Sequence, residues 1–448
     1  MKSNTQLEVS CVGEIYCGGF MPKLKLSLLS MIGGLTLISS SAYAGVDAEV
    51  SYILNTLLFL IGGFLVMWMA AGFAMLESGL VTSKSVSTIA AKNIGLYAIS
   101  GLMFWLVGYN LAYGIPEGGF IGSFLPWSDA SSIETGYSDG SDWFFQMVFC
   151  ATTCSIVSGT LAERIKIWPF FLFCALLAGV IYPIEMGWQW GGGHLAAAGF
   201  SDFAGSTLVH SAGAAAALAG ALLLGPRLGR FKESGEPATM EPFASSSIPL
   251  ATLGVFILWM GWFGFNGGSQ LALGTFEDST AVATIFINTN LAACAGVMAC
   301  AIISRLVSGK TDVVMMLNGA LGGLVAITAE PLAPSPLLAV ILGAIGGIIV
   351  FYGTKLLLKL KIDDVVGAIP VHGFAGIFGT LAVPLSNADA NFGIQLYGIL
   401  WVNIFVFIVA FVIWYLMKMT FGIRISDEAE KLGTDKAEVG VLAYAIRD

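Results

Sequence analysis

Long apolar stretches alternate with short polar connections along most of this chain. From about residue 50 onward, eleven stretches are apolar over lengths that suit a helix crossing the hydrocarbon core of a bilayer. The pattern predicts an all-α polytopic membrane protein with eleven transmembrane helices. The predicted spans are residues 52–76, 88–112, 142–162, 166–187, 206–225, 247–268, 280–304, 312–330, 336–358, 366–386 and 395–420.

A shorter apolar segment precedes these spans. Residues 21–44 open with two lysines, continue with a short apolar core and end in an A-x-A site at residues 42–44. This arrangement is typical of a cleaved secretory signal peptide. We therefore expect the mature chain to begin near Gly45 and translation to start at Met21. An uncleaved first membrane helix is the alternative.

Lysine and arginine recur in every second connection. The connections after spans one, three, five, seven and nine contain them, and those after spans two, four, six, eight and ten contain none. Lys84 and Lys92 are assigned to the first connection, and the last cations follow span eleven. By the positive-inside rule this side is cytoplasmic, so the mature N-terminus is outside and the C-terminus inside.

The spans fall into two sets of five and a final helix. An odd number per set means that the second set crosses in the opposite direction, so we predict a 5+5 inverted repeat, an architecture found in transporters. The predicted parts are an N-terminal extension and signal peptide 1–44, a membrane domain 45–421 with repeat one about 50–226, repeat two about 246–387 and an eleventh helix about 394–421, and a cytoplasmic tail 422–448.

The pattern Asp-x-x-Gly-x-x-x-Val-His occurs twice, from Asp202 to His210 and from Asp364 to His372. Ionisable side chains within a bilayer cost free energy, so the two copies of the motif indicate a functional site. Eight helical residues rise about 12 Å, and half a hydrocarbon core is about 15 Å. Asp202 is thus expected at the outer rim, Asp364 at the inner rim, and both imidazoles near mid-membrane, close enough to touch. An ordinary interhelical hydrogen bond is the alternative for each histidine, and both aspartates suit helix caps.

Aromatic side chains gather near the first copy. Phe145 and Phe149 are four residues apart and share a helix face. Trp262 and Phe265 lie in span six, and a glycine-rich turn that follows Trp190 could place this ring in an outer vestibule. Aromatic faces attract cations by about 0.5–2 kcal/mol. Lipid contact or core packing is the alternative for each ring taken alone.

Composition agrees with the membrane interpretation and excludes other classes. The chain is 56% hydrophobic and 11% charged, with a net charge of −9 and no basic cluster that would suggest nucleic acid. Average soluble domains have about 25% charged residues. The 7 cysteines show no disulfide framework or metal spacing. Because no nucleophile–base set or phosphate loop occurs either, we expect the chain to have no enzymatic activity and to bind no cofactor or metal.

Four stretches of sequence resemble the ammonium transporter (Amt/Mep/Rh) family. They are DFAGSTLVH at 202–210, WFGFNGGS at 262–269, GTLAER at 159–164 and VHG at 371–373. The resemblance covers nearly all of residues 46–448, and the exported N-terminus resembles the bacterial Amt branch. It implies NH4+/NH3 as substrate, with methylammonium as an analogue, and a homotrimer with one pore per subunit in the bacterial cytoplasmic (inner) membrane.

The resemblance also implies individual roles along the route. An outer site recruits the ion, two stacked rings gate it, and paired histidines line the pore beneath. The residues are Trp190, Ser269, Phe149 and Asp202 for recruitment, Phe149 and Phe265 for the gate, and His210, His372, Trp262 and Gln146 for the pore, with Asp364 at the inner rim.

Two departures and one partner follow from the same resemblance. Several relatives have Asp at the position of Gly367, but Gly205 occupies the matching place in the first copy. His194 stands where relatives often have an aromatic or aliphatic residue. A PII-type signal protein is the expected cytoplasmic partner, at the loop with Arg227 and Arg230. An ordinary solvated loop explains the same charges.

Ammonium matches K⁺ in size but can lose a proton. A dry aromatic gate would exclude K⁺ and pass NH3, with the proton relayed by the imidazoles. Two other functions stay open. The first is an ammonium sensor, which a fused signalling domain would favour. About 25 residues follow span eleven here. A channel for another small solute, such as CO2 or water, would not require the recruitment residues.

Overall fold

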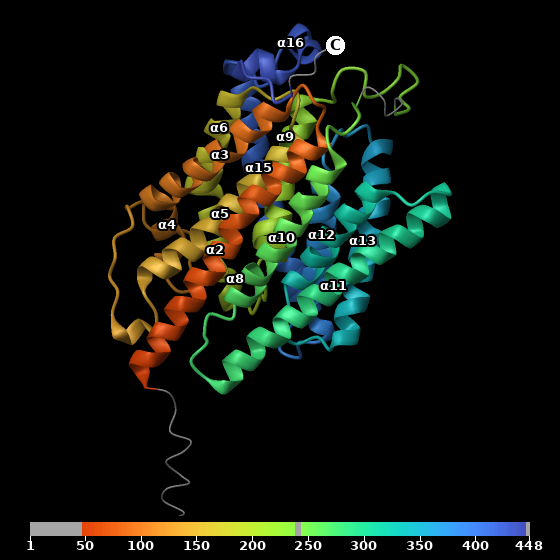
Figure 1. The fold of residues 1–448 in the computed structure, drawn as a ribbon. Coiled ribbons are helices and arrows are strands. Elements are labelled where there is room, and N and C mark those ends of the chain that lie inside the picture. The colour runs from red at the N-terminus through yellow and green to blue at the C-terminus, as the bar shows by residue number, and fades with distance from the viewer. Residues whose placement is uncertain (1–46, 238–242, 445–448) are drawn as a thin grey trace, which may run out of the picture. The chain divides into compact units, whose positions relative to one another are not determined.

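The computed structural model describes residues 47–237 and 243–444 (Figure 1). The predicted signal peptide and its cleavage site lie outside the described residues. Within the described ranges the regular structure is helical, and a helical segment occupies the place of each of the eleven predicted spans.

The first five predicted spans correspond to α2, to α3 continued by α4, to α5, to α6 continued by α7, and to α9. Short α8 lies in the connection before α9. The bounds are α2 Ala48–Leu80, α3 Val86–Met103, α4 Tyr109–Tyr113, α5 Asp139–Thr160, α6 Ile167–Leu176, α7 Tyr182–Gly187, α8 His194–Ala197 and α9 Ala212–Leu224.

The next six correspond to α10, α11, α12, α13, α14 and α15, and α16 follows in the tail. The bounds are α10 Ile248–Gly268, α11 Phe276–Ser308, α12 Val313–Thr328, α13 Pro336–Lys359, α14 Ala375–Ala382, α15 Phe392–Thr420 and α16 Asp427–Leu432. Both α2 and α11 run about one turn further at each end than predicted, because helices continue past the apolar stretch that reveals them.

Eight helical segments of the described chain are long and apolar enough to cross a membrane, so this is an integral membrane protein with multiple helical spans. Two shorter apolar segments, Val313–Thr328 and Ile369–Leu385, accompany them. The eight are Ala48–Leu80, Val86–Tyr113, Ile167–Gly187, Ser206–Leu224, Ile248–Gly268, Phe276–Ser308, Pro336–Lys359 and Phe392–Thr420.

Helix α5 is too polar to belong to either group. Every residue from Phe145 to Thr160 is buried, and the helix packs against α2, α3 and α9. A helix surrounded by other helices does not face lipid, so it can contain hydroxyls that a lipid-facing helix could not.

Several of these spans contain a π-helical turn, which the sequence did not reveal. Such turns follow α3, follow α6, precede α9 and precede α14. Their bounds are Phe104–Gly108, Leu177–Ile181, Ser206–Ser211 and Ile369–Phe374. The last two contain His210 and His372. π-Turns are frequent at functional sites, because the extra residue re-aims side chains.

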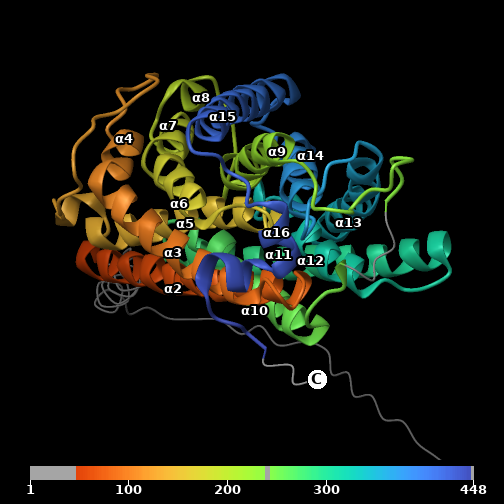
Figure 2. The same cartoon turned by 90° about the horizontal axis from the view of Figure 1, so that it is seen from above.

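The packing of the two predicted repeats is similar. Helix α2 packs along α10, and the two lie side by side in Figures 1 and 2. Contacts of α3 with α5 match those of α11 with α12, and α9 packs on the turn before α14 as α14 packs on the turn before α9. A Cβ on Gly264 of α10 would lie 2.5 Å from the carbonyl oxygen of Gly62 of α2. Glycine therefore allows this close approach.

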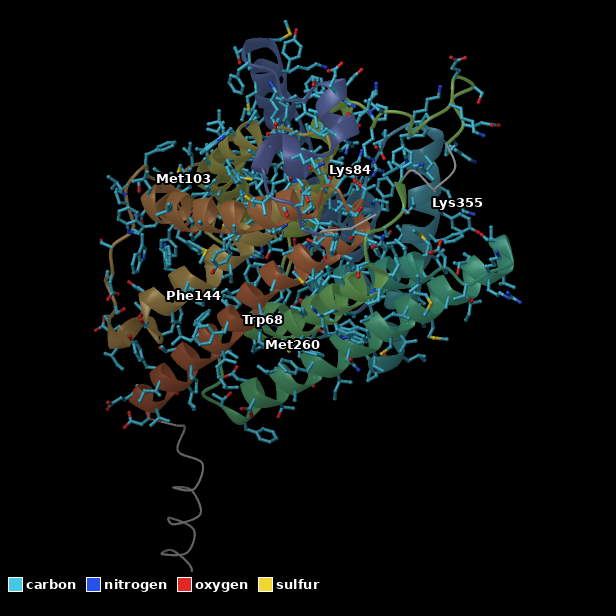
Figure 3. All side chains as sticks on the ribbon, turned by 45° about the horizontal axis from the view of Figure 1, so that its top comes forward. Trp68, Lys84, Met103, Phe144, Met260 and Lys355 are labelled. Atoms are coloured by element: carbon cyan, nitrogen blue, oxygen red, sulfur yellow. The ribbon has the colours of Figure 1, made fainter. Side chains whose placement is uncertain are left out.

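Large apolar side chains cover the outward face of α2 and α10. Trp68 is 52% exposed and Met260 is 42% exposed, and Figure 3 shows them close together on this face. An apolar surface of this kind needs lipid or another protein to cover it.

The tail folds back onto the end of the bundle where α2 finishes and α3 begins. Lys84 Nζ donates to the carbonyl of Glu430 at 2.8 Å, and the Thr88 amide donates to Asp435 at 2.8 Å. The amide of Ile167, at the start of α6, donates to Glu438 at 2.9 Å. Figure 1 shows α16 at this end. These contacts fix the tail to α3, α6 and the α2–α3 connection.

Candidate functional site

A cavity of about 240 Å³, here called the aromatic pocket, is lined by three of the four predicted recruitment residues and by the predicted pore residue Gln146. Trp190, Phe149, Ser269 and Gln146 all line it. The Trp190 and Phe149 rings meet edge to face, with centroids 5.9 Å apart. The structure therefore brings together side chains from the α7–α8 connection, α5 and the end of α10, as the sequence predicted.

The same pocket contains a carboxylate and tyrosines that the sequence analysis missed. Asp142 lines it together with Tyr109, Tyr113 and Tyr137. The Asp142 carboxylate accepts from the Tyr109 hydroxyl at 2.6 Å and from Gln146 Nε2 at 3.0 Å. Asp142 precedes Gln146 by four residues, so the helical spacing was a usable signal. The tyrosines come from other elements, and no local spacing reveals them.

Asp202 does not line the aromatic pocket but supports it from below. Its buried carboxylate accepts from four successive backbone amides, and its carbonyl accepts from Trp190 Nε1 at 3.0 Å. The amides are those of Gly205 at 3.1 Å, Ser206 at 2.9 Å, Thr207 at 2.8 Å and Leu208 at 2.9 Å. Asp202 thus caps the π-turn that bears His210 and positions the Trp190 ring.

Two stacked rings close the floor of the aromatic pocket. The Phe149 and Phe265 centroids are 3.9 Å apart with planes inclined by 25°, and both side chains are buried. Phe145 packs beside Phe149 at 4.8 Å. Phe149 lines the aromatic pocket, and Phe265 stacks both on Phe149 and on His210.

The two histidines meet directly beneath this stack. The His210 ring lies 5.3 Å from Phe265 and 5.2 Å from His372, centroid to centroid. The two Nδ1 atoms are 3.2 Å apart. One Nδ1 must donate and the other accept, so the two rings have opposite tautomers. Phe149, Phe265, His210 and His372 form a continuous series, here called the ring column.

A tryptophan and a phenylalanine hold the column from the sides. Trp262 stacks on His210 at 5.1 Å, and its Nε1 donates to Thr328 Oγ1 at 2.8 Å. Phe73 of α2 lies 6.2 Å from His372. Trp262 was predicted as a pore residue, whereas Phe73 was missed because nothing in its own helix distinguishes it from a core residue.

Asp364 caps the second π-turn at the opposite end of the column. It accepts from Thr160 Oγ1 at 3.0 Å and from the amides of Gly367 and Ile369 at 3.2 and 2.7 Å. It also lines a cavity of about 330 Å³ with Arg230 and other charged residues. This cavity is called the charged pocket below.

The glycine of each motif copy has a left-handed backbone. Gly205 has φ +99° and Gly367 has φ +83°. A Cβ on Gly367 would lie 2.6 Å from Asn318 Nδ2. The absence of the family's Asp at Gly367 therefore preserves the backbone of the first copy, because the left-handed region favours glycine.

Three cations that the sequence analysis placed in connections between spans are buried. Lys92 lies within α3, with its Nζ donating to the Ser158 carbonyl at 2.7 Å, so its assignment to a connection was wrong. Arg227 pairs with Glu163 and, at 2.8 Å, with Asp363. Arg230 lies 3.3 Å from Asp363. Long side chains cross from loop backbones into the protein, which their positions in sequence do not show.

The Asp363 carboxylate is the centre of this ion network. Burial raises its pKa, but hydrogen bonds and charge from Arg227, together with the charge of Arg164, outweigh burial and hold the pKa well below the usual value. A buried carboxylate with two guanidinium neighbours stays ionised at neutral pH.

His194, the third histidine, lies apart from the ring column. Its ring stacks on Phe120 at 4.3 Å and lies near Trp188 and Trp401, at 5.0 and 5.2 Å. It does not line the aromatic pocket. Burial among these rings lowers its pKa.

The sequence model of the Ammonium Transporter Family matches residues 57–444 of this chain. The chain belongs to this family. Ammonium transporter Amt2 of Archaeoglobus fulgidus is 41% identical over 421 residues, 86% of this chain and 87% of that protein. The ammonium transporter of Bacillus subtilis is 34% identical over 404 residues, 85% of this chain and 96% of that protein.

Solved structures of the family share the fold. A sensor Amt protein superposes with a TM-score of 0.82 at 33% identity, covering 88% of this chain and 100% of that chain. Mep2 of Candida albicans gives 0.77 at 27% identity, covering 89% and 92%. The family assignment made from the four motifs is confirmed, as is the interpretation of the chain as a membrane transporter rather than an enzyme.

Proposed function

We propose that this ammonium transporter recruits NH4+ in the aromatic pocket, removes its proton at the Phe149–Phe265 stack and passes NH3 beside the histidines. The proton moves separately through the two imidazoles. The observation that carries this proposal is the ring column, which ends in the 3.2 Å contact between His210 Nδ1 and His372 Nδ1.

The aromatic pocket suits a small cation with hydrogens to donate. Ring faces attract a cation by about 0.5–2 kcal/mol, and the Asp142 carboxylate lines the same cavity as Trp190 and Phe149. The Ser269 hydroxyl donates to the Phe265 carbonyl at 2.8 Å, so its oxygen can accept from the ion. Asp202 acts here by holding Trp190 and the first π-turn.

The stacked rings favour a neutral species. An ion must shed its water to pass Phe149 and Phe265, and the cost in an apolar site is several kcal/mol at least. K⁺ cannot shed its charge, whereas NH4+ becomes neutral when it loses one proton. A dry gate therefore separates two ions that size cannot separate.

The histidines offer a path for the proton that ammonium loses. His210 with hydrogen on Nδ1 can accept a proton at Nε2 and pass the Nδ1 hydrogen to His372. His372 then releases its Nε2 hydrogen on the far side. The opposite tautomers that the Nδ1–Nδ1 contact requires are those that this relay needs.

The test replaces His210 and His372 by Ala and measures currents in proteoliposomes for ammonium and K⁺ pulses. We expect loss of the ammonium current or admission of K⁺. His194→Ala is the matched control, because this ring lies outside the column, and it should retain the unaltered behaviour. Unchanged ammonium current with unchanged K⁺ exclusion in the double variant would sink the proposal.

The proposed topology has eleven spans in a 5+5 inverted repeat, with the aromatic pocket outside and the charged pocket inside. The repeated helix contacts support the repeat, and the cations near the charged pocket support the orientation. Cysteines introduced at Glu117 and at Lys310, in a background without Cys294, test it with an impermeant maleimide. Labelling of Lys310→Cys in intact cells would contradict this orientation in the cytoplasmic membrane.

We also propose a homotrimer, supported by the exposed apolar face of α2 and α10. Phe64 is 60% exposed and Phe256 is 63% exposed on these helices, beside Trp68 and Met260. Lipid could cover the same face. Native mass spectrometry in detergent decides between them, and a protein that remains monomeric at all concentrations would remove the trimer.

A PII-type protein is the proposed partner on the side of the charged pocket. Arg227 and Arg230 are buried in ion pairs, so the proposal is supported by the exposed residues Lys232, Glu233 and Glu236 of the same loop. Pull-down with the organism's own PII protein, with and without ADP, tests it. No binding in either condition would exclude this partner.

A sensor function is the second candidate, favoured by the likeness to a sensor Amt protein along the whole of that chain. A sensor binds ammonium without conducting it at a useful rate. Ammonium binding by calorimetry together with no current in proteoliposomes would support sensing and would contradict the transport proposal.

A further inference from the structure

A small cavity adjoins the ring column on the side of His372. It has about 10 Å³ of space for the centre of a water-sized sphere, close to what one water molecule needs. Its lining includes Phe73, Glu77, Asn318, Gly367 and His372. The cavity therefore connects a pore histidine with the carboxyl group of Glu77.

Glu77 is buried in α2 with one oxygen unused. Its side chain is enclosed by the protein, and Oε2 accepts from the Ser158 hydroxyl at 2.7 Å. Oε1 has no hydrogen-bond partner among the described residues. A buried carboxylate oxygen without a partner costs free energy and needs an explanation.

Lys92 of α3 balances the charge without occupying this oxygen. Its Nζ donates to the Ser158 carbonyl at 2.7 Å and lies 4.6 Å from the centre of the Phe170 ring. Ser158 therefore stands between the two charges, with its hydroxyl on Glu77 and its carbonyl on Lys92. The arrangement leaves the Glu77 Oε1 atom available for a water.

His372 lines this cavity and has a second ring nitrogen. Its Nδ1 is taken by His210 at 3.2 Å, which leaves Nε2 for the cavity that the ring also lines. A single water there could accept from His372 Nε2 and donate to Glu77 Oε1. A histidine and a carboxylate on the wall of one water-sized cavity are the groups that a one-water proton relay requires.

We propose that Glu77 is the proton acceptor that follows the histidine pair, and this inference rests on the proposed function. The N–H bond at His372 Nε2 breaks and the O–H bond at Glu77 Oε1 forms. The water accepts one proton as it gives up another, and so ends unchanged. The positive charge of Lys92 then opposes retention of the proton by attracting the carboxylate.

The exit from Glu77 leads toward the charged pocket. Asn318, Val366 and Gly367 line both the small cavity and the charged pocket. These shared residues therefore separate the small cavity from a cavity of about 330 Å³ that borders Arg230 and Asp364.

The competing explanation is that Glu77, Ser158 and Lys92 only tie three helices together. Glu77→Gln keeps the shape and removes the carboxylate but leaves Lys92 uncompensated. Glu77→Gln with Lys92→Gln removes both charges, so it restores neutrality without restoring a proton acceptor. The double variant separates the two explanations.

The experiment uses the full chain in proteoliposomes and two readouts, the charge moved per ammonium pulse and the uptake of labelled methylammonium. We expect a fall of at least about tenfold in charge moved in Glu77→Gln and in the double variant, with a lower ratio of charge to substrate. Glu77→Asp should recover part of the charge. Glu330→Gln is the matched control, because Glu330 is another buried carboxylate, bonded to Ala333 and Asn387, and lines neither pocket.

Two results would overturn the inference. One is charge movement within about twofold of the unaltered protein in the double variant, which would leave Glu77 only a counter-charge for Lys92. The other is a parallel fall of charge and substrate uptake in both variants, with the ratio unchanged. Absence of ammonium current in the unaltered protein would instead reject the proposed transport function itself.

Discussion

The two copies of the Asp-x-x-Gly-x-x-x-Val-His motif build the same backbone but end in different surroundings. In each, an aspartate caps a π-turn, a left-handed glycine turns the chain and a histidine joins the ring column. The first copy lies under an aromatic pocket with one carboxylate at its wall. The second opens to a charged pocket with Arg230 and Lys355 in its lining.

This difference shows which features of the transport path come from the repeat and which come from residues outside it. The repeat supplies the column, because two equivalent turns bring the Nδ1 atoms to 3.2 Å. The residues around each end of the ring column, which are not repeated, give the transport path its direction. Rings and a carboxylate suit capture of a cation, whereas a mixture of fixed charges suits release into water.

The largest expected effect comes from breaking one cap and then the other. Asp202→Ala removes the acceptor for four backbone amides, each worth about 1 kcal/mol or more when left buried and unpaired. We expect loss of roughly 4 kcal/mol and of all transport. Asp364→Ala removes fewer bonds and should cost about half as much. Thermal unfolding in detergent and proteoliposome currents measure both.

Equal losses in the two variants would contradict the ranking of the caps. Asp202→Asn is the control for size, since it keeps one acceptor oxygen in the same place. It should lie between the unaltered protein and Asp202→Ala in unfolding temperature. A stability for Asp202→Asn below that of the Ala variant would contradict the capping explanation.

The second prediction concerns the ion network near the second copy. Asp363→Asn leaves the buried Arg227 charge with Glu163 alone, and removal of one partner from a buried pair costs about 3–5 kcal/mol. We also expect transport to fall, by an amount equivalent to half or more of this free energy, because Asp363 is next to the Asp364 cap. The midpoint of thermal unfolding at pH 7 is the measurement, with exposed Asp389→Asn as the control.

The pH dependence of the same pair has a defined sign. The folded-state pKa of Asp363 lies below its usual value, about 3.9 for an unfolded aspartate. Its contribution is therefore complete above about pH 5 and is lost as the pH falls from there toward the folded pKa. Unfolding temperature should be insensitive to Asp363 between pH 5 and 8. An acid-induced decline as steep in Asp363→Asn as in the unaltered protein would contradict this assignment.

The local pattern predicted the helical segments and the meeting of the two histidines, the family resemblance added the stacked rings, and neither revealed the surroundings of either pocket. Apolar length marks a span, and the doubled motif marks His210 and His372 as equivalent, so both follow from local pattern. Glu77 acts through a partner on another helix, and Asp142 joins Tyr109 of another element as well as Gln146 of its own helix. Lys92 looked like a loop cation because the positive-inside rule counts charges and does not see burial. A π-turn produces no characteristic spacing of apolar residues along the sequence, so the π-turns were missed as well.

The third prediction concerns the Phe149–Phe265 stack, the gate between the two regions. Phe265→Leu removes the stack on Phe149 but keeps an apolar side chain, so water can enter above His210. A barrier lowered by about 1.4 kcal/mol would raise K⁺ entry about tenfold. Currents on K⁺ pulses measure this. Phe263→Leu is the control, because its ring packs on Phe286 and not on the column. K⁺ exclusion as tight as in the unaltered protein would show that the stack is not the selective barrier.

The smallest expected effect concerns Asp142, the carboxylate in the lining of the aromatic pocket. Asp142→Asn keeps an acceptor for the Tyr109 hydroxyl but removes the negative charge from the pocket. Loss of roughly 1 kcal/mol of attraction corresponds to about fivefold weaker apparent affinity for ammonium, with the maximal current nearly unchanged. Concentration series of current measure it. Asp139→Asn, one turn earlier and not part of the pocket lining, is the control. An unchanged half-saturating concentration in Asp142→Asn would mean that the rings alone recruit the ion.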